Sequence, residues 1–117
     1  MRETTELTEA AGRFADRLRA APQSRLLRGA AAEGLSLARE LALRAQRLEA
    51  PGAAPRTMPD AGPFAVGDQV TVAVNDFAEA WRAALAGAGP EAGRAALQAE
   101  LAGAVSLVRE AEARAGL

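Results

Sequence analysis

The sequence predicts an all-α protein, a four-helix bundle, and three observations support this fold class. Apolar residues recur at helical spacing in two blocks, residues 1–49 and 67–117, which cover most of the 117-residue chain. A proline-rich crossover, Ala50–Val66, separates the blocks with a proline at every fourth position, a pattern that no helix tolerates. Each block also contains one internal stop signal. We therefore expect a single domain with short, long, short and long helices, arranged as two helical hairpins joined by the crossover.

The first helix is expected over Glu3–Ala20. Its apolar positions follow the spacing of one helical face, which would be buried against the rest of the domain: Leu7, Ala11, Phe14 and Leu18. Pro22 ends the helix, because proline lacks the backbone donor that the next helical turn needs.

The second helix is expected over Arg25–Glu49, with Ser24 as its N-cap. Two rows recur every seven residues along it, one mostly of large side chains (Leu27, Gly34, Leu41 and Leu48) and one of alanines (Ala31, Ala38 and Ala45). A large row beside a small row suits close, coiled-coil-like helix packing. A helix of this length would extend about 37 Å at 1.5 Å per residue.

The third helix is expected over Gln69–Ala86, with Asp68 as its N-cap. Residues 69–74 read QVTVAV, and this alternation of β-branched residues leaves a strand as the alternative. Helical spacing nevertheless continues through the whole segment, at Val70, Val74, Phe77, Trp81 and Leu85. Just before this helix, Phe64 and Val66 are expected to fix the end of the crossover to the domain.

The fourth helix is expected over Glu91–Ala115, after a stop signal at residues 87–90. It would bury Leu97, Leu101, Ala104, Val105, Val108 and Ala115. The two longer helices would extend beyond the shorter ones by about 10 Å at 1.5 Å per residue. This overhang would expose apolar residues that either the crossover or a second chain must cover. We expect a second copy, and therefore a homodimer.

The two halves of the chain also resemble each other. Leu7–Ala21 reads LTEAAGRFADRLRAA and Val70–Ala84 reads VTVAVNDFAEAWRAA. An internal duplication would explain the shared Phe-Ala and Arg-Ala-Ala pairs. Alanine, arginine and glutamate are so frequent here that chance alignment is the alternative, and the sequence alone leaves both open.

The composition excludes several classes of chemistry. The chain has no His, Cys, Lys or Tyr, so it has no disulfide, no thiolate or imidazole metal ligand and no Schiff-base lysine. We expect no enzyme activity, no cofactor and no metal. A formal net charge of −1 argues against general attraction to nucleic acid or to anionic membranes. Without an evident signal peptide or membrane span, a cytoplasmic location is expected. The 32 alanines, with no Lys, Ile or Tyr, indicate a high-GC bacterial genome.

Candidate interface residues lie on the second and third expected helices. Arg25, Arg28, Arg39 and Arg47 share one face of the second helix, which is either a binding stripe for anions, nucleic acid or an acidic partner, or a solvated surface. Leu43 falls among these arginines and Leu35 near their edge, which favours contact with a protein. Trp81 is either a core residue or an interface anchor. The interface candidates are thus Leu35, Leu43, Trp81, Arg39 and Arg47.

Asp76 and Glu79 form a carboxylate pair on the third expected helix. Carboxylate-bridged metal sites in helical bundles normally add a Glu-x-x-His pair on facing helices, and this chain has no histidine. Both residues also fall opposite the apolar stripe of that helix, so we expect them to face water.

The function expected from these observations is non-enzymatic: a protein-protein interaction, scaffold or regulatory bundle that self-associates. An alternative is a bundle that binds a small effector in a pocket between Phe14, Phe77 and Trp81. A further alternative is nucleic-acid binding through the arginine stripe of the second helix.

Overall fold

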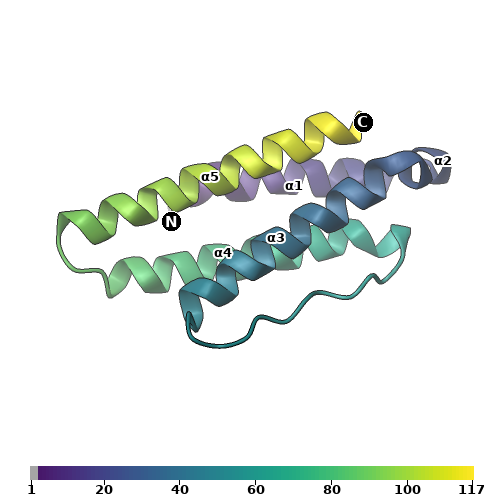
Figure 1. Ribbon diagram of the computed structural model, residues 1–117. Helices are drawn as coiled ribbons and strands as arrows, with labels where there is room; N and C mark the ends of the chain where they lie inside the picture. The colour runs from purple at the N-terminus through teal and green to yellow at the C-terminus, as the bar shows by residue number, and fades with distance from the viewer. Residues whose placement is uncertain (1–2) are drawn as a thin grey trace.

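The computed structural model describes residues 3–117, and this part of the chain is helical with no strand (Figure 1). The helices are α1 (Thr5–Ala20), α2 (Gln23–Arg25), α3 (Ala31–Glu49), α4 (Val66–Ala86) and α5 (Glu91–Ala115). A kinked segment η1 (Leu26–Ala30), which is not helical at Gly29, joins α2 to α3, and a 3₁₀ turn η2 (Pro63–Ala65) precedes α4. The predicted all-α class is therefore confirmed.

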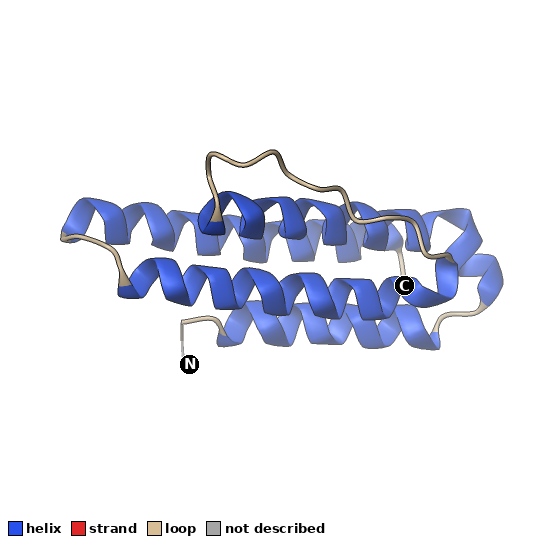
Figure 2. Ribbon diagram, turned by 90° about the horizontal axis from the view of Figure 1, so that it is seen from below, coloured by secondary structure: helices blue, strands red, loops and turns tan. Residues whose placement is uncertain are grey.

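The four long helices lie roughly along one axis, with α1 and α5 running in one direction and α3 and α4 in the other (Figure 1). Helix α4 packs mainly on α3 and α1, and α5 also lies against α3 and α1. The closest neighbours of each helix therefore come from the other half of the sequence, which differs from the two hairpins that we expected. The cause is the crossover, which runs back along the length of α3 and lets α4 begin at the same end (Figure 2).

The core contains the predicted apolar faces of α1 and α4. Phe14, Phe77 and Trp81 are completely buried, and alanines fill the spaces between the helices around them. The completely buried alanines include Ala11, Ala38, Ala73 and Ala104. The stripes predicted for the first and third helices are confirmed, except that Leu85 is only partly buried.

The predicted second helix does not run unbroken from Arg25 to Glu49. Gly29 has φ +145°, a conformation that side-chain-bearing residues rarely adopt, and it separates the first turns from α3. Because of this break, Leu27 leaves the predicted row and is 65% exposed. Gly34 and Leu41 remain buried as the heptad pattern predicts, and Leu48 is partly buried.

Helix α4 includes residues 69–74, so the strand alternative is wrong. The helix begins at Val66, three residues earlier than predicted, and Asp68 lies in its first turn and not at its N-cap. Val66 is buried as expected. The expectation for Phe64 is wrong, because its side chain in η2 is 70% exposed.

Glycines set the distance between α4 and its neighbours. A Cβ atom at Gly34 would collide with Cγ1 of Val66, so α3 and α4 touch where both begin. A Cβ atom at Gly67 would lie 2.8 Å from Cγ of Arg19, which shows an equally close approach of α4 to α1. Small residues thus allow the close packing that the alanine-rich sequence predicts.

The predicted overhang is wrong about which helices project. The four long helices contain 16, 19, 21 and 25 residues in chain order, so short and long helices do not alternate. The projecting ends belong to α4 and α5, which extend past α1 and α3 at the end where residues 87–90 connect them (Figures 1 and 2). Residues 91–96 are exposed there.

Candidate functional site

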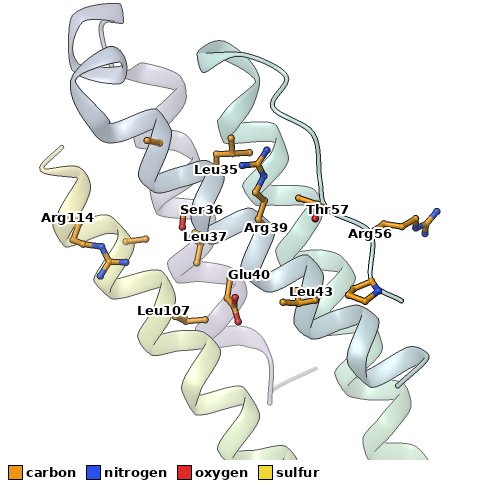
Figure 3. Close-up of a pocket in the computed structure, with 13 residues that line it drawn as sticks. Leu35, Ser36, Leu37, Arg39, Glu40, Leu43, Arg56, Thr57, Leu107 and Arg114 are labelled. Carbon is orange, nitrogen blue, oxygen red and sulfur yellow. The ribbon is translucent and has the colours of Figure 1, made fainter. Parts of the chain in front are cut away.

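The candidate site is a groove of about 580 Å³ on the outer face of α3, which we call the α3 groove. Helix α3 lies between the crossover on one side and α5 on the other (Figure 3). The lining residues come from all three segments: Ala32, Leu35, Ser36, Leu37, Arg39, Glu40 and Leu43 of α3; Pro55, Arg56 and Thr57 of the crossover; Leu107, Ala111 and Arg114 of α5.

The crossover wall of the α3 groove is held by side chains of α3 and α4. Gln46 accepts a hydrogen bond from the backbone N–H of Arg56 at 2.7 Å and donates one to its carbonyl oxygen at 2.8 Å. Nε of Arg39 donates to the carbonyl oxygen of Met58 at 2.8 Å, and Nε2 of Gln69 donates to that of Pro59 at 2.8 Å. These bonds satisfy backbone groups of a segment that forms no regular secondary structure.

The floor of the α3 groove is apolar. Leu35 is 9% exposed, Leu43 and Leu107 are partly exposed, and Ala111 is buried. The leucines thus pack on the domain from below while part of their surface still faces the groove. Another molecule could bury the area that Leu43 and Leu107 leave exposed, and the free energy gained would scale with that apolar area.

The charges around the α3 groove are not balanced. Glu40 pairs with Arg44 at 2.8 Å, and Arg114 pairs with Glu33 at 2.9 Å. The hydrogen bond that Arg114 donates to Glu33 raises the pKa of Arg114 above its ordinary value. Arg39 bonds only a backbone carbonyl, and the guanidinium of Arg56 has no carboxylate partner among residues 3–117. The crossover side of the groove is therefore positively charged.

Three of the five predicted interface residues, Leu35, Arg39 and Leu43, meet in the α3 groove (Figure 3). Arg47 is exposed further along α3, beside a separate hollow that Glu100 also lines. Trp81 lies in the core, where its Nε1–H donates to the carbonyl oxygen of Leu97 at 2.6 Å. This burial favours the core interpretation of Trp81 over an interface anchor.

Sequence reasoning missed the groove residues outside α3, namely Pro55, Arg56, Thr57, Leu107, Ala111 and Arg114. The one available signal was Arg56, a cationic residue within a proline- and alanine-rich connector. The residues of α5 gave none, because their contribution depends on how α5 packs against α3.

The predicted arginine stripe is not one helical face. Arg25 and Arg28 precede the break at Gly29, whereas Arg39 and Arg47 follow it. Arg25 also donates a hydrogen bond to the carbonyl oxygen of Gly116, next to the C-terminus. The four guanidinium groups therefore do not form the continuous stripe on which the alternative of nucleic-acid binding depended.

The effector pocket suggested between Phe14, Phe77 and Trp81 has no support in the structure. All three rings are completely buried and pack in the core. Asp76 and Glu79 are exposed on α4, as predicted. Within residues 3–117, no group of three or more His, Cys, Asp or Glu side chains is arranged to hold a metal ion.

Comparison with known proteins adds no relative. No family model matches the chain, and no curated protein or solved structure is significantly similar to it. None of the helices in the described part of the chain combines the length and apolar character needed to cross a membrane.

Proposed function

We propose that this protein is a non-enzymatic interaction module, a four-helix bundle in solution that binds another polypeptide in the α3 groove. One observation carries the proposal: leucines with partly exposed surface lie beside two arginines, Arg39 and Arg56, that have no carboxylate partner among the described residues. Apolar contacts surrounded by polar groups are typical of protein interfaces, where arginine is enriched.

The dimensions of the α3 groove support a helical or extended polypeptide as its occupant. The groove follows α3 from Ala32 to Leu43, about three helical turns or roughly 16 Å at 1.5 Å per residue. Helices that dock in such grooves use apolar anchors at positions i, i+3, i+4 and i+7, which span a similar length. The lining residues Ser36, Arg39 and Thr57 are exposed to solvent, so a long chain can enter without a large rearrangement.

The composition supports a non-enzymatic role. The sequence has no His, Cys, Lys or Tyr, which removes several of the side chains that act as nucleophiles or general bases near neutral pH. The charged residues lining the α3 groove are three arginines and Glu40, and that carboxylate is already paired with Arg44. These groups are suited to binding and give no arrangement for acid–base catalysis.

Site-specific photo-crosslinking in the cells that naturally produce this protein tests the proposal. A photoreactive amino acid at Leu43, in the floor of the α3 groove, should give a discrete crosslinked product with another polypeptide, whether a second copy or a different protein. The control carries the same amino acid at Arg13, an exposed position of α1 outside the groove, and should give no such product. No product at Leu43, or equal products at both positions, would overturn the proposal.

A further inference from the structure

We infer that the α3 groove binds a second copy of this chain, through the outer face of that copy's α4. This inference rests on the proposed function, because it names the occupant of the same groove. The surface in question, which we call the acidic α4 face, consists of Val72, Asp76 and Glu79. It lies on the side of α4 that points away from the buried Trp81 stripe.

The acidic α4 face lacks partners within its own chain. Val72 is 53% exposed, which makes it one of three large apolar side chains within residues 3–117 that the fold leaves mostly uncovered. Asp76 and Glu79 are exposed, and neither forms an ion pair or hydrogen bond with any residue in the range 3–117. By contrast, Asp68 on the first turn of the same helix pairs with Arg19 at 2.9 Å.

The acidic α4 face complements the α3 groove in charge and in length. The groove presents two guanidinium groups without carboxylate partners, Arg39 and Arg56, beside apolar surface. The α4 face presents two unpaired carboxylates beside one exposed valine. Val72, Asp76 and Glu79 occupy positions i, i+4 and i+7, so they form a single row of about 10 Å at 1.5 Å per residue. This row fits within the length of the groove.

The position of the two surfaces allows a symmetric dimer. Helices α3 and α4 are neighbours that run in the same direction (Figure 1), and each carries its surface on the side that faces away from the core. A two-fold axis can then place each α3 groove on the acidic α4 face of the other copy, and the contact occurs twice. That the contact occurs twice is important, because a single exposed ion pair contributes little to binding. The apolar contacts supply most of the affinity, while the charges select the partner.

A charge exchange tests this arrangement in the purified full-length chain. One variant combines Arg39→Glu with Arg56→Glu, and the other combines Asp76→Arg with Glu79→Arg. Each variant alone places like charges opposite each other at both contacts, so its dimer dissociation constant should rise at least about tenfold. An equimolar mixture should restore the dimer, because a heterodimer again pairs opposite charges at both contacts. Sedimentation equilibrium measures the mass of each sample.

Three controls keep the result interpretable. Arg56→Glu alone removes no hydrogen bond of that side chain, so it should weaken the dimer without lowering the melting temperature. Phe64→Ala changes an exposed aromatic residue outside both surfaces and should leave the dissociation constant unchanged. Raised salt should weaken the wild-type dimer, since screening reduces attraction between exposed charges.

Specific outcomes would overturn the inference. These are a wild-type chain that stays monomeric at every concentration, charge variants that dimerise as well as the wild type, or a mixture of the two variants that forms no heterodimer. The proposed function fails separately. If the photoreactive group at Leu43 captures a different protein while the purified chain is monomeric, the α3 groove is an interaction site and only its occupant has been misassigned.

Discussion

The two faces of α3 differ in how completely the fold buries their apolar surface and provides partners for their polar groups. On the inner face, Ala38 and Leu41 are completely buried against α4 and its neighbours. On the outer face, Leu43 keeps part of its surface exposed, and Arg39 finds a carbonyl oxygen but no carboxylate. The inner face therefore accounts for stability. The outer face retains apolar area and charge that the isolated chain leaves without partners, and the proposed interaction uses this face.

The same contrast distinguishes the core from the crossover. Around Trp81 the helices meet through closely packed apolar side chains, and the indole N–H has a backbone acceptor. The crossover, by contrast, is attached mainly through hydrogen bonds from long polar side chains such as Gln46 and Gln69. Each such exposed bond contributes about 0.5 kcal/mol net, much less than the burial of a large aromatic ring. Changes in the core should therefore affect folding, and changes at the groove should mainly affect binding.

The largest effect is expected in the core, for Trp81→Ala. Removing this completely buried ring leaves a cavity and should lower the free energy of unfolding by about 3–5 kcal/mol. Leu43→Ala in the α3 groove is the matched control and should lower it by less than about 1 kcal/mol, since the leucine is partly exposed. Urea titration monitored by circular dichroism measures the free energy of unfolding of both variants. Equal losses would contradict the division between core and groove.

Smaller changes in the free energy of unfolding are expected for two glycine substitutions, one of which destabilises the protein while the other stabilises it. In Gly34→Ala the new methyl group meets Val66 and lies 3.0 Å from Cδ1 of Leu18. The overpacking outweighs the gain in helix propensity, for a net loss of about 1 kcal/mol. Gly12→Ala adds a methyl group to open space on α1 and should stabilise by about 0.5–1 kcal/mol. Thermal unfolding compares the two, and stabilisation at Gly34 would show that α3 and α4 are less tightly packed than described.

Removing the main attachment of the crossover should have a local effect. Gln46→Ala eliminates both hydrogen bonds to the backbone of Arg56 and should cost about 1 kcal/mol. Amide hydrogen exchange at Arg56 should become faster, because its N–H loses its acceptor, while exchange in α1 stays nearly unchanged. Gln98→Ala, at an exposed position of α5, is the control. Unchanged exchange at Arg56 would mean that another contact fixes the crossover.

The smallest effect is expected for an exposed ion pair. Arg109 and Glu6 approach to 2.6 Å, but their side chains are 58% and 63% exposed. Arg109→Ala should therefore change the free energy of unfolding by less than about 1 kcal/mol, and the difference should shrink further in high salt. A larger loss would show that surface charge stabilises α1 against α5 more strongly than their apolar contacts do.

The sequence predicted the part of the fold that follows from apolar periodicity. The stripes through Phe14 and through Phe77 and Trp81 lie in the core because helical spacing determines which side chains share a face. The break at Gly29 was not predicted, since a glycine inside a helical pattern is compatible with a helix and only the structure shows its positive φ. The extra turn of α4 before Gln69 was missed because Asp68 is a good N-cap residue.

The candidate site was predicted only in part, for a related reason. Leu35, Arg39 and Leu43 share a face of one helix, and their spacing alone indicated a protein contact. The crossover wall depends on the pairing of Gln46 with Arg56 and of Arg39 with Met58, ten and nineteen residues away in the chain. Such bonds between side chain and backbone leave no periodic signal in the sequence.

The most direct test of the central claim is hydrogen exchange of the wild-type chain at low and high protein concentration. A dimer through the α3 groove predicts that amides of the crossover around Arg56 and of α4 around Asp76 gain protection as concentration rises. Amides near Trp81, already in the core, should not change. Protection that is independent of concentration in all segments, or that increases only around Phe64, would contradict the assignment of the α3 groove and the acidic α4 face.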